Sequence, residues 1–311
     1  MQVIVTGAAG FIGSQVAEAL LTRGDSVTGL DNFDPSTDAA RKHGNVARLK
    51  RHGGFSFLEG DTRDPSLGEL LPPRFDAVIH LAALAGVRES AQRPTVYADV
   101  NVTGTANVLD VARRRNVQRF VFASSASVYG ENAGRPSGED SQTTRPLSCY
   151  GATKLAGEAL CHSFHHLYGT DLSVLRFFSV YGPGQRPDMA IARFTRQMTQ
   201  GQPIHVAGDG STRRDFTFIA DIVGGVLAAL DRCSGFHVYN LGSGRPVALS
   251  TVIQLLTSQL GVDPRMMREP LSALDAAMTW ADVSLARQEL GYEPKVGIEE
   301  GVRLFVESIR A

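Results

Sequence analysis

The sequence predicts an α/β fold: a doubly wound parallel sheet with helices on both faces, and a smaller mixed α/β domain appended to it. Two observations support this prediction. Short β-branched strands alternate with amphipathic helical segments along the first half of the chain, a pattern typical of βαβ units. The 311 residues, 43% of them hydrophobic, suffice for one large domain and a smaller one.

The opening stretch, residues 2–14, predicts a strand, a tight turn and the start of a helix. A β-branched run is followed by Gly7, Gly10 and Gly13, and then by a helical pattern. Gly7 permits the turn, Gly10 lets backbone N–H groups approach a phosphate, and Gly13 lets the helix lie close to the sheet. The positive end of the helix dipole favours a negative charge at the same place. We therefore expect the pyrophosphate of a dinucleotide to bind here.

Later strands end in residues that suit the same ligand. Strand 26–30 is followed by Asp31, at the distance of about 20 residues where an acidic side chain accepts hydrogen bonds from a ribose and repels a 2′-phosphate. This favours NAD over NADP. Strands 55–62 and 76–83 also have polar or small residues at their carboxyl ends, where parallel sheets bind ligands. The expected cofactor contacts are Gly7, Gly10, Phe11, Ile12, Gly13, Asp31, Asn32, Asp61, Thr62, Leu81, Ala82, Ala83, Asn101, Tyr150 and Lys154.

Three residues near the middle of the chain form a candidate catalytic group. A helix expected over 97–115 leads into a strand that ends at Ser125, and a later helix opens with Tyr150 and Lys154. Residues one helical turn apart share a face, so both side chains can reach one reacting centre. Lowering the pKa of a tyrosine from about 10 by about three units takes roughly 4 kcal/mol, which an ammonium and a positive nicotinamide ring can supply. Ser125 is expected to hold the reacting oxygen.

Composition excludes several classes of partner. A net charge of −1 predicts no polyanion-binding surface, so neither nucleic acid nor an anionic membrane is expected. The first strand starts at Gln2, and no apolar run approaches the roughly 20 residues of a membrane span, so we expect a cytoplasmic location. His162, His165 and His166 have the spacing of metal ligands but no nearby carboxylate or cysteine. No metal is therefore expected.

Six motifs occur in order along the chain. They are HLAALAGVRES at 80–90, SSASVYG at 124–130, YGATK at 150–154, LRFFSVYGP at 175–183, RPDM at 186–189 and RRDF at 213–216. Together they resemble the extended short-chain dehydrogenase/reductase family of NAD-dependent sugar-nucleotide epimerases. The resemblance covers nearly the whole chain and is strongest to UDP-glucuronate 4-epimerases, with UDP-glucose 4-epimerases next.

The resemblance implies an isomerase with a Rossmann domain and a homodimer built from the helices near Tyr97 and Tyr150. Both helices carry an apolar stripe, at Val108 and Val111 and at Leu155 and Ala159, which is expected to form the dimer surface. The NAD-binding domain is expected at 1–175 and 213–238, and the nucleotide-sugar-binding domain at 176–212 and 239–311. Tyr150 is implied to take the O4 proton of a UDP-sugar while hydride moves from C4 to NAD, before both steps reverse on the other face. The expected substrate contacts are Arg88, Ser125, Ser127, Tyr150, Ser179, Arg186, His205 and Arg214.

Related activities need residues that this chain lacks. Dehydratases of the family place an Asp-Glu pair before Val-Tyr-Gly, and decarboxylases usually have Glu at the second position, whereas this chain has Ala126 and Ser127. Glucuronate as substrate would give a β-keto acid, whose carboxylate must be held out of alignment with the ketone to prevent loss of CO2. Ser127, Ser179 and Arg186, with Arg88, are the donors expected to hold it.

Three alternatives remain open. Arg186 can instead cap a loop at the domain junction, with UDP-glucose as the substrate. The chain can also be a catalytically silent NAD-binding sensor, or a net dehydrogenase that accumulates NADH. Three departures from the family are also present: Leu84 stands where Gln is frequent, Cys149 replaces Pro, and residues 272–275 lack the usual Arg-x-Gly-Asp pattern. The last removes one expected basic contact with the nucleotide.

Overall fold

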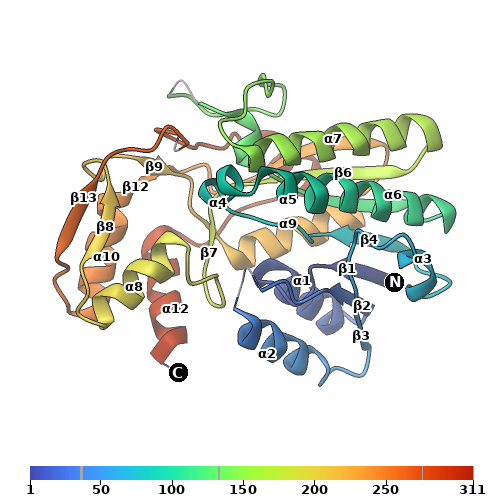
Figure 1. Ribbon diagram of the computed structural model, residues 1–311, viewed down its shortest axis with the longest axis horizontal. Helices are drawn as coiled ribbons and strands as arrows, with labels where there is room; N and C mark the ends of the chain where they lie inside the picture. The colour runs from blue at the N-terminus through green and yellow to red at the C-terminus, as the bar shows by residue number, and fades with distance from the viewer. Residues whose placement is uncertain (36–37, 132–133, 275, 311) are drawn as a thin grey trace.

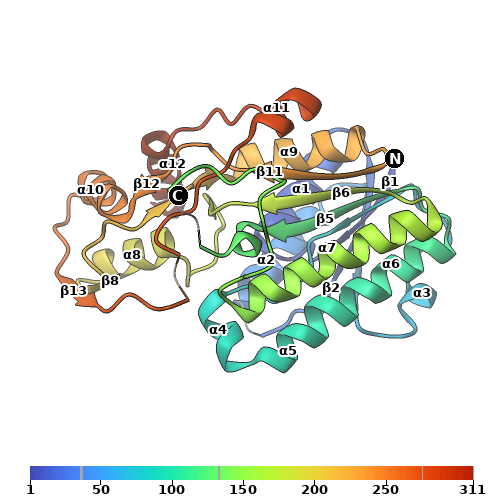
Figure 2. The same cartoon turned by 90° about the horizontal axis from the view of Figure 1, so that it is seen from above.

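The computed structural model describes residues 1–35, 38–131, 134–274 and 276–310. Its centre is a parallel seven-stranded sheet in the order β11-β6-β5-β4-β1-β2-β3, shown in Figures 1 and 2. The strands are β1 (Gln2–Thr6), β2 (Ser26–Asp31), β3 (Phe55–Glu59), β4 (Ala77–His80), β5 (Arg119–Ser125), β6 (Asp171–Phe177) and β11 (Phe236–Leu241). The order reverses between β1 and β4, which makes the sheet doubly wound. The predicted fold class is confirmed.

Helices cover both faces of this sheet (Figure 2). One face carries α1 (Phe11–Thr22), α2 (Ala39–Leu49) and α9 (Ile219–Asp231). The other carries α3 (Leu67–Leu70), α4 (Val87–Gln92), α5 (Pro94–Ala98), α6 (Gly104–Arg114) and α7 (Cys149–Tyr168). The helix expected over 97–115 starts earlier, at Pro94, and a π-helical turn at Asp99–Thr103 joins α5 to α6. Parallel strands buried on both faces explain the nearly continuous apolar runs of β1 and β5.

A smaller lobe lies beyond the carboxyl ends of the strands, on the left of Figure 1. It contains α8 (Ala190–Thr199), α10 (Leu249–Leu260), α12 (Ile298–Arg310), and the parallel pair β8 (Ile204–Ala207) and β13 (Met266–Glu269). Short pairs join the lobes: β7 (Val180–Tyr181) with β10 (Thr217–Phe218), and β9 (Arg213–Arg214) with β12 (Val247–Ala248). The remaining helix α11 (Ser284–Leu290) packs on α9 and β11. The lobe therefore faces the edge of the sheet where ligands bind.

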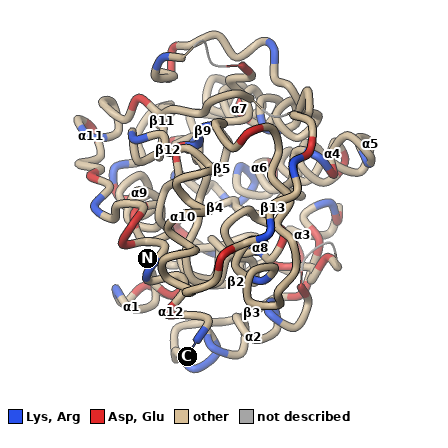
Figure 3. The backbone as a smooth tube through the Cα atoms, turned by 90° about the vertical axis from the view of Figure 1, so that its left-hand side faces the viewer, with Lys and Arg blue, Asp and Glu red and all other residues tan. Residues whose placement is uncertain are grey.

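The chain crosses between the two lobes more than once. The division into domains remains a prediction, and two of its boundaries fall inside strands: β6 continues past 175 to Phe177, and β11 past 238 to Leu241. Around the end of the molecule formed by the smaller lobe, Figure 3 shows acidic and basic positions intermixed along the chain. In the described part of the chain, no helix has the length and apolar character that crossing a bilayer requires.

Candidate active site

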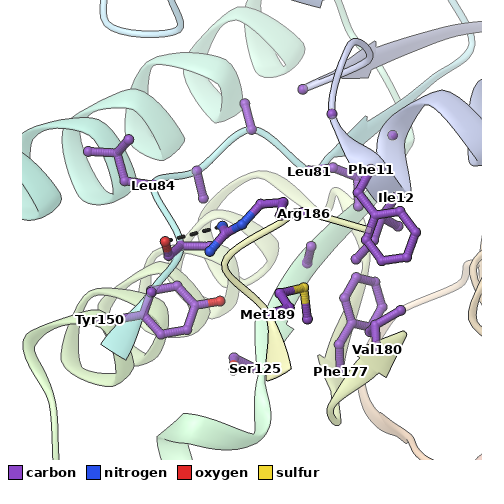
Figure 4. A pocket seen from close by; sticks show the side chains of 18 of the residues that line it. Phe11, Ile12, Leu81, Leu84, Ser125, Tyr150, Phe177, Val180, Arg186 and Met189 are labelled. Carbon is purple, nitrogen blue, oxygen red and sulfur yellow. Dashed lines mark hydrogen bonds between the residues drawn. The ribbon is translucent and has the colours of Figure 1, made fainter. Parts of the chain in front are cut away.

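A cavity of about 640 Å³ runs along the carboxyl ends of the strands, between the sheet and the smaller lobe. Figure 4 shows Tyr150 and Arg186 near one another in this cavity, with Phe11 and Ile12 farther along it. Most of the residues expected from the sequence line this one cavity. They are Gly7, Gly10, Phe11, Ile12, Gly13, Asp31, Asn32, Asp61, Thr62, Leu81, Ala82, Ala83, Ser125, Ser127, Tyr150, Lys154, Ser179, Arg186 and Arg214.

The glycine turn is too closely packed for side chains at Gly7 and Gly13, so backbone atoms form its surface. Gly7 has φ +71°, and a Cβ there would lie 2.8 Å from the Ala82 nitrogen. A Cβ on Gly13 would lie 2.1 Å from the Gly7 carbonyl oxygen, so the helix could not approach the strand. Gly10, the N-cap of α1, provides no side chain to satisfy the first N–H groups of that helix. Uncapped N–H groups at the edge of a cavity suit an anionic group such as a pyrophosphate.

Asp31 is held at the far end of the cavity by three donors. Its Oδ2 accepts a hydrogen bond from the Ala9 N–H (3.2 Å), and its Oδ1 accepts from the Phe33 N–H (2.9 Å) and from Lys42 Nζ (3.0 Å). The carboxylate is therefore fixed beside the glycine turn, where a ribose would meet it. Sequence reasoning missed Lys42, because nothing in the pattern of α2 shows which strand end it faces.

Asn32 and Asp61 meet at the end of β2 and β3. Asn32 Nδ2 donates to Asp61 Oδ2 at 2.8 Å. Arg63 also donates to both oxygens of Asp61, at 2.9 and 2.7 Å. These bonds lower the pKa of Asp61 to about 2, because they stabilise the charged form. Asp61 therefore stays ionised at neutral pH, which suits an acceptor for the amino group of an adenine.

The end of β5 and the start of α7 bring the candidate catalytic residues together. Ser148 caps α7 by accepting from the Gly151 N–H at 3.0 Å, which fixes where the first helical turn begins. Ser125 lies close enough to Tyr150 to lower the pKa of its phenol. Lys154 Nζ donates to the Ala123 carbonyl at 2.8 Å and lies 6.0 Å from the centre of the Tyr150 ring. The three residues form one cluster at the cavity wall.

Burial acts on the protonation of both α7 residues. Burial raises the pKa of Tyr150, against the hydrogen bond with Ser125 and the positive charge of Arg186, which lower it. Burial also lowers the pKa of Lys154, to about 8, because a desolvated ammonium is disfavoured. Arg186, on the loop that follows β7, adds a positive charge near the phenol, which also lowers the Tyr150 pKa.

Arg186 stands beside Tyr150 on a loop that follows β7 (Figure 4). Its Nη1 donates to the Ala85 carbonyl at 3.2 Å. Its Nε and Nη2 bind the two oxygens of Asp188 at 3.0 and 2.7 Å. The guanidinium is mostly buried, so a charge-assisted contact there is strong. The position suits an anionic group next to the reacting hydroxyl.

Asn101 does not line the cavity, contrary to the expected cofactor contact. It is buried in the π-helical turn, where its Oδ1 accepts from the Leu84 N–H at 2.8 Å. Its Nδ2 donates to the Leu84 carbonyl at 3.0 Å and to Thr153 Oγ1 at 2.9 Å. These bonds engage both the oxygen and the nitrogen of the amide. Asn101 therefore fastens the loop after β4 to α7.

Arg88 and His205 line an adjoining cavity of about 250 Å³ instead. Ser179 and Arg214 are among the residues that line both cavities, so the two cavities are adjacent. His205 Nδ1 lies 2.8 Å from Glu269 Oε1 on the neighbouring strand β13. Leu274, Ala276 and Thr279 line the main cavity from the segment that lacks the family's usual basic residue, while Asp275 lies outside the described residues. The part of the main cavity that adjoins the smaller cavity suits a nucleotide base and its diphosphate.

Asp215 is a structural residue of the site that sequence reasoning missed. It is fully buried directly after Arg214. Its Oδ1 accepts from the N–H and the hydroxyl of Ser243, both at 2.7 Å. Its Oδ2 accepts from the N–H groups of Gly244 (3.0 Å) and Ala281 (2.9 Å). The carboxylate therefore ties three chain segments together behind Arg214.

A buried ion pair lies beneath the catalytic helix. Glu158, one turn after Lys154, binds Arg176 of β6 through Oε1–Nε (3.0 Å) and Oε2–Nη2 (2.7 Å). Ser124, next to Ser125 on β5, also donates to Glu158. Arg176 Nη1 donates to the Tyr129 hydroxyl at 2.9 Å. These bonds fix α7 against the strand ends that carry the candidate site.

Two of the three histidines of α7 make structural contacts, and the third, His166, is exposed. The rings of His162 and His165 pack on the Phe236 ring, whose centroid lies 5.1 Å from that of His162 and 5.9 Å from that of His165. His165 Nδ1 also lies 2.8 Å from the Thr170 carbonyl oxygen. Across the described ranges, no three His, Cys, Asp or Glu side chains gather in a way that could hold a metal ion.

Known proteins match this chain along most of its length. The NAD dependent epimerase/dehydratase family matches residues 3–242. A UDP-glucuronate 4-epimerase from Thermodesulfobacterium geofontis is 41% identical over 303 residues, which cover 96% of this chain and 93% of that relative.

Two solved structures also match the whole chain. UDP-glucuronic acid 4-epimerase from Bacillus cereus, in complex with UDP-glucuronic acid and NAD, is 37% identical with a TM-score of 0.95, covering 100% of this chain and 99% of that one. UDP-glucose 4-epimerase from Thermotoga maritima, with UDP-glucose, is 33% identical with a TM-score of 0.92, at the same coverage. The resemblance found in the motifs is confirmed, and this chain belongs to the NAD dependent epimerase/dehydratase family.

Proposed function

We propose that this protein is an NAD-dependent UDP-glucuronate 4-epimerase, which interconverts UDP-glucuronate and UDP-galacturonate. The observation that carries the proposal is the meeting of Tyr150 with a partly buried guanidinium, Arg186, in one cavity with the glycine turn. Tyr150 supplies acid-base chemistry at a sugar hydroxyl, and Arg186 suits a carboxylate next to that hydroxyl. The relatives that carry this activity match the chain along nearly its whole length.

The glycine turn and Asp31 would hold NAD, which when bound would supply the acceptor and donor of the hydride. The phenolate oxygen of Tyr150 removes the proton from O4 of the sugar as C4 loses its hydride, which leaves a ketone at C4. Ser125 donates a hydrogen bond that holds the oxygen in place. After the hydride returns to the opposite face of C4, Tyr150 gives the proton back to O4. The sugar is inverted at C4 and no net oxidation takes place.

The intermediate has a specific weakness when the sugar is glucuronate. A carboxylate on the carbon next to the C4 ketone belongs to a β-keto acid, which loses CO2 when the C–C bond aligns with the carbonyl π system. Ser127, Ser179 and Arg186 line the cavity, and their donors can hold the carboxylate out of that alignment. Ser125 Oγ lies 3.2 Å from Ser127 Oγ, so the groups for O4 and for the carboxylate are adjacent.

A second candidate, UDP-glucose 4-epimerase, is favoured by one observation. The Arg186 fork already binds Asp188 and the Ala85 carbonyl, which is the arrangement expected if it only caps its loop. To decide, UDP-glucuronate and UDP-glucose are offered separately to the purified enzyme and the products are resolved by NMR. We expect UDP-galacturonate without UDP-pentose. Turnover of UDP-glucose alone would replace the proposal with the hexose activity, and steady NADH accumulation would indicate a net dehydrogenase.

We also propose a homodimer, although one of its two predicted surfaces is wrong. Val108 and Val111 of α6 are 3% and 2% exposed, so they pack inside the protomer. On α7, in contrast, Ala159 is exposed and Leu155 partly so. This face, with the adjoining α5, supports pairing across a two-fold axis.

The dimer is tested by light scattering at micromolar concentration. We expect a mass of twice the 33.4 kDa of one chain. Ala159→Arg should shift the mass toward one chain, because a long cation cannot be accommodated at a closely packed helix pair. A single-chain mass for the unaltered protein would contradict the proposal.

A further inference from the structure

A loop over residues 182–188 spans the cavity from the cofactor side to the reacting centre. Near its start, the Pro183 carbonyl accepts from Gln15 Nε2 of α1 at 2.8 Å. At its next residue, Gly184, a Cβ would lie 3.8 Å from the Phe11 ring, beside the glycine turn. Two residues later the loop carries Arg186, next to Tyr150. The loop thus connects the place expected for the pyrophosphate with the place expected for the sugar.

Arg41 reaches this loop from the other side of the cavity. It belongs to α2, and the helix's N-cap Asp38 and its residues Lys42 and Asn45 line the cavity near Asp31. Arg41 Nη1 donates to the Gly184 carbonyl at 3.2 Å and also to the Gln185 carbonyl. Both Arg41 and Gly184 line the cavity. A single side chain therefore joins the adenosine side of the cavity to the loop that carries Arg186.

The loop is shaped to accept these two bonds. Gly184 has φ +82°, a conformation that side chains rarely adopt, and it turns two successive carbonyls toward α2. Gln185 is buried, and its Oε1 accepts from the Gly182 N–H at 3.1 Å, which closes the turn from inside. Both bonds come from one nitrogen, Nη1 of Arg41, whose two hydrogens can each meet one of these carbonyls.

The proposed reaction gives this contact a role, and the inference rests on that function. The hydride removed from C4 must return to the same sugar, so a cofactor that leaves between the two half-reactions would strand the ketone. We propose that Arg41 is a positioning residue that fastens the 182–188 loop across the cavity and thereby retains the dinucleotide through each turnover.

The test compares Arg41→Ala with Arg48→Ala, a matched control. Arg48 lies on the same helix and pairs with Glu18 at 3.4 Å, away from the loop. Each protein is loaded with NADH, and its release is followed by fluorescence in the absence of sugar. Because bonds to a charged donor are lost, we expect Arg41→Ala to release NADH about tenfold faster or more. Arg48→Ala should release it at the unaltered rate.

Two further readouts make the test decisive. Arg41→Lys keeps the charge but places a compact ammonium on a shorter side chain, so its release rate should lie between those of the unaltered protein and Arg41→Ala. Epimerisation by Arg41→Ala should fall on dilution and recover with added NAD. Equal release by Arg41→Ala and the unaltered protein, or equally fast release by Arg48→Ala, would overturn the proposal. Because release is measured without sugar, a failure of the proposed activity would not be mistaken for a failure of this inference.

Discussion

Replacing Tyr150 by phenylalanine is expected to reduce epimerisation by about a thousandfold or more, within the range that a positioned acid-base group contributes. The ring and its packing remain, so NAD should stay bound. The only group lost is the oxygen that exchanges a proton with O4. Product formation is measured by NMR and bound NAD by its absorbance after denaturation.

Tyr97→Phe is the matched control for this experiment. The Tyr97 ring lies edge-on to Tyr150 at 6.5 Å, and its hydroxyl donates to the Ala85 carbonyl at 3.2 Å. Its loss removes a neighbouring phenol without removing the base, so activity should change by less than about tenfold. Residual epimerisation in Tyr150→Phe equal to that of Tyr97→Phe would rule out Tyr150 as the base.

Replacing Glu158 by leucine is expected to destabilise the fold by about 3–5 kcal/mol. The change leaves the Arg176 guanidinium buried without its carboxylate, and it also removes the acceptor for Ser124. The double variant Glu158→Leu with Arg176→Met should recover much of the loss, because no unpaired charge remains. Urea unfolding of each protein, followed by circular dichroism, measures the differences.

An exposed ion pair on α12 provides the control for this prediction about stability. Glu300 binds Arg303 on α12 at 2.7 Å, with both side chains in solvent. Glu300→Ala should therefore leave the unfolding midpoint close to that of the unaltered protein. If Glu158→Leu also left it unchanged, the ion pair beneath α7 would not hold the catalytic helix in place.

The sequence was sufficient for features that depend on neighbours in the chain. The glycine turn, Asp31 at the end of β2, and the pairing of Tyr150 with Lys154 all follow from local geometry, because strand, turn and helix fix those spacings. Their place in one cavity follows from the rule that parallel strands bind ligands at their carboxyl ends. For the same reason the fold class was predictable.

Features that depend on distant segments were not predictable. Arg41 binds Gln185, and Asp215 binds Ala281. These residues are far apart in the sequence, so no local periodicity or motif spacing predicts their hydrogen bonds. Asn101 was assigned to the cofactor, yet the π-helical turn buries its amide against Leu84. Val108 was assigned to a dimer surface, yet it packs inside, because an apolar stripe does not show which of two faces a helix buries.

The order of strands has a consequence for synthesis on the ribosome. Six strands of the sheet are complete at Phe177, but the strand that covers the edge of β6 starts only at Phe236. At roughly 5–20 residues per second, β6 waits for seconds with one row of N–H and C=O groups unpaired. Such an edge is a template for strands of other chains. The nascent protein is therefore most exposed to aggregation while the segment between these two strands is being made, after the cofactor half of the sheet has already formed.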